Sequence, residues 1–157
     1  MLDIDGVLNV IPQGHDNYGG IFHKHLVENL KRIVDETGAK IVVSSTWRLN
    51  GIISIQNMWR DRGLPGEVIG ITPSFWISAD DSIPQYKKDK RGYEIQDWID
   101  KNNPDNYVIL DDDVDMLEGQ MDNFVQTSEN PDHEDCIDIG YGLTSICADK
   151  AIEILKK

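Results

Sequence analysis

Two short apolar runs constrain the fold of this chain most, because each ends directly in a cluster of polar side chains. Ile41, Val42 and Val43 are followed by Ser-Ser-Thr-Trp-Arg, and residues 107–110 are followed by Asp-Asp-Asp. Runs that are apolar at every position are typical of strands buried on both faces, as in parallel sheets. Open α/β sheets bind ligands at the carboxyl ends of such strands. The sequence therefore predicts an α/β fold whose site is built from strand ends.

Amphipathic segments alternate with the predicted strands. Apolar spacing predicts helices over 23–36, 52–59, 90–99 and 144–155, and further strands over 68–71 and 123–127. This alternation indicates a parallel, doubly wound sheet. We expect a loop or small flap over 10–22, a long irregular segment over 72–89 and a solvent-exposed acidic loop at 132–136.

Length and composition exclude several classes of protein. The 157 residues suit one domain, and 39% hydrophobic residues are enough for an ordinary globular core. With only two cysteines, a disulfide framework is excluded and a reducing cytoplasm is expected. We expect no membrane span and no signal peptide. The net charge of −13 works against non-specific binding of nucleic acid. The sequence indicates no oligomeric state.

Asp3 and Asp5 form a pair of carboxylates just before Gly6. On an extended chain, residues i and i+2 point to the same side, roughly 6–7 Å apart. Two like charges at this separation are costly unless a cation lies between them or one is protonated. The pair therefore indicates a divalent-metal site, or a nucleophile with its acid/base partner. An ordinary polar turn after a strand is the alternative.

A second acidic cluster and a basic pair complete the pattern. Asp111, Asp112, Asp113 and Asp115 place four carboxylates within five residues at a strand end. These charges repel one another unless a cation binds, and Mg²⁺ is the hard cation that prefers oxygen ligands. A basic pair at 90–91 opens a predicted helix, where a cation opposes the helix dipole. Anion binding at that helix end accounts for the pair.

Taken in chain order, these pieces resemble the motifs of the haloacid dehalogenase (HAD) superfamily of phosphatases, over nearly the whole chain. They are more similar still to the HAD domain of "Swiss Army Knife" RNA-repair proteins, on residues 43–48, 91–95, 108–113 and 142–144. The resemblance implies a three-layer, Rossmann-like α/β fold with a central parallel sheet. It also implies one domain over residues 1–157, without a sizeable cap domain.

The resemblance further implies a Mg²⁺-dependent phosphohydrolase that works through an aspartyl-phosphate intermediate. Asp3 would be the nucleophile and Asp5 the general acid/base. Either Lys90 or Arg91 would neutralise the nucleophile and the phosphate. The implied ligands of Mg²⁺ are Asp3, the backbone carbonyl of Asp5, Asp111 and Asp112.

The implied substrate contacts come mainly from the strand end at 44–48. Ser45 would bind the transferring phosphoryl group, with Ser44 as the alternative. Thr46, Arg48 and Gly6 are further candidate substrate-binding residues, although Thr46 would also suit the cap of a following helix.

The expected substrate is a phosphomonoester, and the RNA-repair resemblance favours the end of an RNA or DNA chain. Phe75, Trp76 and Tyr86 lie near lysines in the irregular segment, a combination that suits either stacking on bases or packing beneath the loop as a small hydrophobic cluster. Two alternatives stay open. The chain could be a phosphatase of small phosphorylated metabolites, or a catalytically weak binding or regulatory module with the same fold.

Overall fold

Two parallel strand pairs form the centre of the fold in a computed structural model, which describes residues 1–10, 14–127 and 141–157. Strand β3 (Ile41–Val43) pairs with β4 (Val68–Ile71), and β5 (Ile109–Asp111) pairs with β6 (Phe124–Gln126). Leu2 joins the two pairs, because it forms parallel bridges to both Val43 and Leu110. The chain therefore has the α/β class that the apolar runs predict. The acidic loop expected at 132–136 lies outside the described residues.

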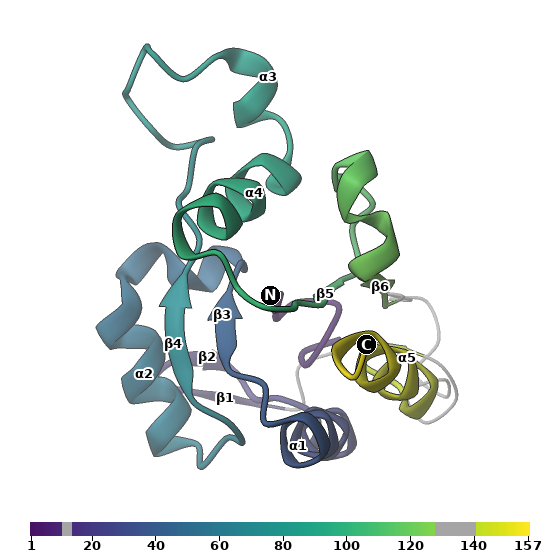
Figure 1. Cartoon of the computed structure of the whole chain (residues 1–157). Helices are drawn as coiled ribbons and strands as arrows, with labels where there is room; N and C mark the ends of the chain where they lie inside the picture. The colour runs from purple at the N-terminus through teal and green to yellow at the C-terminus, as the bar shows by residue number, and fades with distance from the viewer. Residues whose placement is uncertain (11–13, 128–140) are drawn as a thin grey trace.

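In the described part of the chain, four helices of ten residues or more flank these strands (Figure 1). They are α1 (Lys24–Thr37), α2 (Ile52–Asp61), α4 (Arg91–Asn102) and α5 (Ser145–Leu155). Each corresponds to a helix predicted from the sequence. Val108 and Leu110 pack in one hydrophobic cluster with residues of α1, α2 and α5, whereas Ile109 packs in a second cluster with Ile95 of α4. Helices thus cover both faces of β5.

Shorter elements fill the connections and were not predicted. A hairpin of β1 (His15–Asp16) and β2 (Gly19–Gly20) occupies part of the expected loop. The 3₁₀ helices are η1 (Thr46–Asn50) and η2 (Glu118–Asn123). The one-turn helix α3 (Gln85–Lys88) lies in the segment expected to be irregular. Elements this short carry too few residues for a hydrophobic period to be read.

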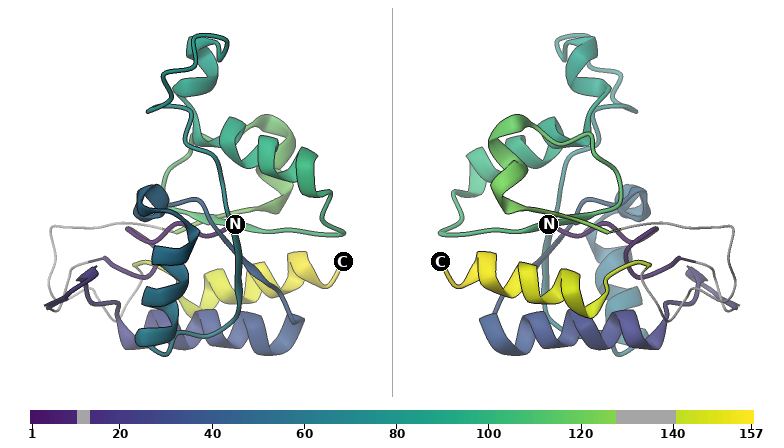
Figure 2. Two further views of the ribbon diagram at one scale, coloured as in Figure 1. Left: turned by 90° about the vertical axis from the view of Figure 1, so that its left-hand side faces the viewer. Right: turned by 90° about the vertical axis from the view of Figure 1, so that its right-hand side faces the viewer.

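The segment 72–89, which contains α3, extends beyond α4 and away from the strands in all three views (Figures 1 and 2). Its base is anchored, since the Phe75 N–H donates a hydrogen bond to Glu94 Oε1 at 2.6 Å. Its far end returns through α3, where the ring of Tyr86 meets the ring of Tyr93 edge to face at 5.4 Å. No helix in the described part of the chain is long and apolar enough to span a membrane.

Candidate active site

Asp3 is placed at the centre of the strands by the backbone hydrogen bonds around it. The Asp3 N–H donates to Leu110 O at 2.9 Å, and the residue is 4% exposed. The chain then turns, with the Gly6 N–H donating to Asn9 O at 3.0 Å. Gly6 adopts φ +73°, and a Cβ there would lie 2.3 Å from Cγ of Asp112. Glycine at this position therefore permits the close approach of Asp112, the role that the structure gives to this predicted substrate-binding residue.

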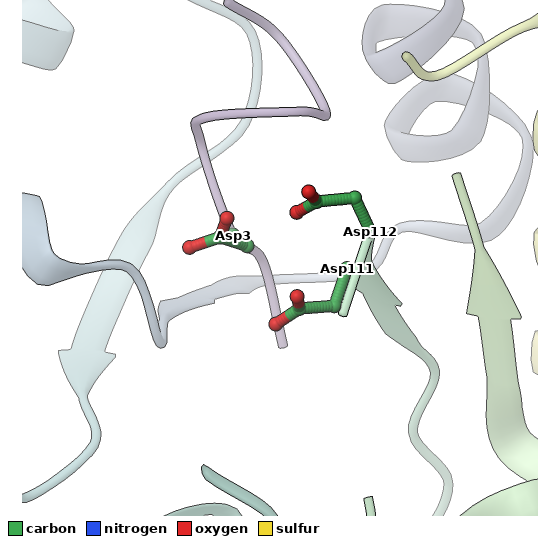
Figure 3. A group of neighbouring side chains, drawn as sticks. All are labelled: Asp3, Asp111 and Asp112. Carbon is green, nitrogen blue, oxygen red and sulfur yellow. The ribbon is translucent and has the colours of Figure 1, made fainter. Parts of the chain in front are cut away.

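Three carboxylates from two different strand ends meet at this point. One oxygen from each of Asp3, Asp111 and Asp112 lies within 4.8 Å of the others. Figure 3 shows the three side chains gathered around one space, with Asp111 and Asp112 reaching toward Asp3. Asp111 is fully buried and Asp112 is half-buried. The structure thus brings together the three carboxylates expected to bind a metal, whereas Asp5 was expected to contribute its backbone carbonyl.

Arg91 is the cation in contact with this group. Its Nη1 donates to Asp3 Oδ1 at 2.6 Å and to Asp111 Oδ2 at 3.1 Å. Asp115 fixes the start of α4, because its Oδ2 accepts a hydrogen bond from the Arg91 N–H at 2.8 Å. Lys90 is the N-cap residue of α4 and is exposed. Of the two cations left open by the sequence, Arg91 is the one that reaches the carboxylates.

The protonation of the group reflects burial and like charge. Burial raises the pKa of Asp3, against the opposing effect of Arg91 and of a hydrogen bond from Ser45. Burial, together with the charge of Asp3, raises the pKa of Asp111 to about 8. Burial lowers the pKa of Arg91, but the charges of Asp3 and Asp111 outweigh it and raise that pKa above its ordinary value. The guanidinium therefore stays charged, and one cation faces three acidic groups.

This donor set fits a hard divalent cation. Mg²⁺ is bound in proteins by one or two carboxylates, with waters and substrate oxygens completing its shell. Asp3, Asp111 and Asp112 offer carboxylate oxygens only, and burial together with the nearby charges of Asp3 and Asp112 raises the pKa of Asp111 unless a cation joins them. These three side chains would hold the ion.

The hydroxyls after β3 occupy different environments. Ser45 is buried, caps η1 by accepting a hydrogen bond from the Trp47 N–H at 3.4 Å, and also bonds to Asp3. Ser44 is buried, and its Oγ has no hydrogen-bond partner among the described residues. Thr46 is exposed. Ser45 is therefore the hydroxyl that contacts Asp3, and it also takes the capping role that the sequence suggested for Thr46.

Arg48 is enclosed by the protein, although the sequence placed it among the substrate-binding residues. It is 2% exposed, and its Nη2 forms an ion pair with Glu94 Oε2 at 2.5 Å. The remaining guanidinium hydrogen bonds go to the backbone oxygens of Ser44, Thr72 and Pro73. With its donors committed in this way, Arg48 joins η1, the end of β4 and α4 instead of presenting a charge to a substrate.

Asp5 is held apart from the carboxylate group. Its side chain is exposed, and its Oδ1 accepts a hydrogen bond from Asn9 Nδ2 at 2.8 Å. Its Oδ2 accepts from Trp47 Nε1 at 2.9 Å. Asn9 and Trp47 were not among the predicted site residues. Their positions in the sequence could have indicated them, because both follow strand ends that carry predicted site residues.

Comparison with known families identifies the family that contains this site. The family model of the "HAD domain in Swiss Army Knife RNA repair proteins" matches residues 1–131. The chain belongs to this family. The match includes Asp3, Ser45, Arg91, Asp111 and Asp112, so all side chains that meet at the centre of this HAD domain lie within it. Neither a curated protein nor a solved structure matches the chain significantly.

Proposed function

We propose that this HAD domain is a Mg²⁺-dependent phosphohydrolase that acts through an aspartyl phosphate on Asp3. The observation that carries the proposal is the contact of Arg91 with Asp3 and Asp111, beside Asp112. A buried carboxylate with a fixed cation and further acidic ligands suits nucleophilic attack on a phosphoryl group. A bound Mg²⁺ would supply charge neutralisation of these carboxylates and of the phosphate oxygens.

Each protein group has a defined task in this scheme. A carboxylate oxygen of Asp3 attacks phosphorus, and the bond from phosphorus to the leaving oxygen breaks. Asp5 gives its proton to that oxygen. A water then attacks the phosphoryl group and loses a proton to Asp5, which releases phosphate and regenerates Asp3. Arg91 and Ser45 bind the phosphoryl oxygens during both steps.

The proposed substrate is a phosphate at the end of an RNA or DNA chain. The family is that of HAD domains in RNA-repair proteins, which favours this class. We further propose the three-layer, Rossmann-like arrangement of the superfamily, with the segment 72–89 in place of a sizeable cap. An uncapped site suits a substrate too large to be enclosed. Small metabolites normally need walls that bury most of the ligand.

Trapping of the intermediate tests the proposal. Turnover is measured with Mg²⁺ and p-nitrophenyl phosphate. The intermediate is measured by incubating the protein with Mg²⁺ and a ³²P-labelled oligonucleotide phosphate and then quenching in acid. We expect turnover and a hydroxylamine-sensitive label on the wild type, and neither on Asp3→Asn. Asp113→Asn is the matched control, because Asp113 is exposed and lies outside the carboxylate group. Absence of turnover on every phosphate ester tested, with the metal bound, would instead favour a binding module.

A further inference from the structure

A small cavity adjoins the carboxylate group on the side of the segment 72–89. It has a volume of about 220 Å³ and lies between the start of η1, Trp76 and the α3–α4 turn. Arg91 and Asp115 line it as well, so Arg91 is shared with the candidate active site. Sites that enclose a whole small molecule measure about 300–1,000 Å³. This cavity therefore suits one group of a larger substrate whose reacting phosphate lies on Asp3.

The charges around the cavity differ from those of the whole chain. Four cations and three anions line it, whereas the chain has 15 basic and 28 acidic residues. All three anions have partners. Glu94 pairs with Arg48, Asp115 accepts from the Arg91 N–H, and Asp89 accepts from the Gln85 side chain at 2.8 Å.

Lys88 and Lys90 differ from these anions in having no partner of opposite charge among the described residues. Neither forms an ion pair with any residue that the structure describes, and Lys88 Nζ donates to the backbone oxygen of Ser78 at 2.9 Å. Two ammonium groups are thus available at one small cavity in an acidic protein. An anion is the ligand that their charge favours.

Trp76 adds a flat apolar surface beside these charges. The residue is 52% exposed, and its ring makes no ring-to-ring contact among the described residues. An exposed indole next to ammonium groups matches the way single-stranded nucleic acid is held, with bases on aromatic faces and phosphates on cations.

We propose that this cavity binds the phosphodiester adjacent to the terminal phosphate of a nucleic-acid substrate. Lys88 and Lys90 contact that phosphodiester, and Trp76 stacks on the neighbouring base. The inference rests on the proposed function, which it deepens by assigning a second subsite. It requires the enzyme to prefer a dinucleotide to a mononucleotide, because only the former carries an internal phosphodiester.

The test compares three substrates that carry the same terminal phosphate, each in its 5′- and 3′-phosphorylated form. They are a mononucleotide, a dinucleotide, and the same dinucleotide with an uncharged methylphosphonate linkage. Each is assayed for kcat/KM with the wild type and for equilibrium binding with Asp3→Asn. Because the binding assay needs no turnover, it remains informative if the proposed hydrolysis fails.

We expect the dinucleotide to exceed its methylphosphonate analogue by roughly 10–100-fold, as for hydrogen bonds to charged groups, and to exceed the mononucleotide by more, because stacking on Trp76 adds to this factor. Lys88→Ala and Lys90→Ala should remove most of the preference over the methylphosphonate and have little effect on the methylphosphonate itself. Trp76→Ala should weaken both dinucleotides by about 5–100-fold relative to the mononucleotide. Lys87→Ala is the matched control, because it removes the same charge from the same turn outside the cavity.

Two results would overturn the subsite. One is equal kcat/KM and equal binding for the mononucleotide and the dinucleotide. The other is a loss with Lys87→Ala as large as that with Lys90→Ala, which would reduce the effect to overall charge. A failed proposed function has a different signature, in which the dinucleotide binds preferentially but no phosphate ester is hydrolysed.

Discussion

The indole nitrogen of Trp47 donates a hydrogen bond to Oδ2 of Asp5 over 2.9 Å. The ring itself is fixed by its neighbours. Phe22 meets it edge to face at 5.5 Å, and the Arg62 guanidinium lies 5.5 Å from its centroid. Arg62 in turn forms a two-point ion pair with Asp16 of β1, at 2.9 and 2.7 Å. The orientation of the proposed acid/base thus depends on contacts that reach from the hairpin to α2.

Trp47→Phe keeps a ring in this place and removes the hydrogen bond to Asp5. We expect a loss of kcat that is larger for alkyl phosphates than for p-nitrophenyl phosphate, because a poor leaving group depends more on proton donation. The loss should stay below the roughly 10²–10⁴-fold expected for Asp5→Asn. Trp59→Phe is the control, since it removes an indole hydrogen bond to Pro65 O instead. The same leaving-group dependence in both variants would rule out a positioning role for Trp47.

Gly6→Ala separates the effect of backbone strain from that of steric contact with Asp112 in the proposed metal site. The new Cβ would overlap Asp112, so we expect strongly weakened Mg²⁺ binding by calorimetry and loss of activity. Gly38→Ala is the matched control, with φ +68° against +73° at Gly6 and open space around the new Cβ. A positive φ costs of order 1–3 kcal/mol at either position. If Gly6→Ala bound Mg²⁺ as tightly as Gly38→Ala does, the proposed placement of Asp112 in the metal shell would be incorrect.

Arg48→Met tests the buried ion pair with Glu94. Removing one partner leaves Glu94 as an uncompensated buried charge, which costs roughly 3–5 kcal/mol of unfolding free energy. The exposed pair of Arg60 and Asp61 provides the control, because Arg60→Met should change stability by about 0–1 kcal/mol. Denaturant unfolding measures both values. A loss below 1 kcal/mol for Arg48→Met would show that the pair contributes little.

Asp111→Asn should raise the Tm of the metal-free protein but reduce the gain in Tm that Mg²⁺ produces. The folded pKa of Asp111, about 8, lies above its ordinary value of 3.8, so the metal-free protein loses stability as pH rises between these values. The substitution removes that loss. In chelator at pH 8 we expect Tm to rise by at least about 2–4 °C, the shift for 1 kcal/mol in a domain of this size.

With Mg²⁺ added, the same variant should gain much less in Tm than the wild type does, because a proposed metal ligand is gone. At pH 4 in chelator, the two proteins should have nearly equal Tm. A variant that is less stable than the wild type in chelator at pH 8 would contradict this account of the buried carboxylates.

The sequence was most informative where apolar periodicity alone determines structure. The runs at Ile41–Val43 and 107–110 correspond to β3 and β5, and the spacing of apolar residues located α1, α2, α4 and α5. Strand ends also indicated that Asp3, Asp111 and Asp112 would meet. The choice between Lys90 and Arg91 and the choice between Ser44 and Ser45 stayed open for geometric reasons. Adjacent residues at a helix start point about 100° apart, and adjacent residues on a strand point to opposite faces. The exact register of the helix or strand therefore decides which neighbour faces the site.

Other features depend on contacts between distant residues and carry no local pattern. Arg48 and Glu94 are separated by 46 positions, and each looks like a solvent-exposed charge until its partner is known. For the same reason the sequence did not indicate that the buried face of α4 includes Glu94. The direction of the Asp5 side chain was equally hidden, since it is set by Trp47, 42 residues away.

The backbone hydrogen bonds of Leu2 and Asp3 limit how the protein can open locally. The Leu2 N–H donates to Val42 O and the Asp3 N–H to Leu110 O, both at 2.9 Å, so consecutive amides hold the two strand pairs together. Freeing either amide means separating these halves of the core, which amounts to global unfolding. Deuterium exchange at Leu2 and Asp3 should therefore be as slow as the overall stability allows. Breathing motions that admit a substrate must arise in other parts of the chain, while the residue proposed to attack phosphorus stays on the least mobile backbone.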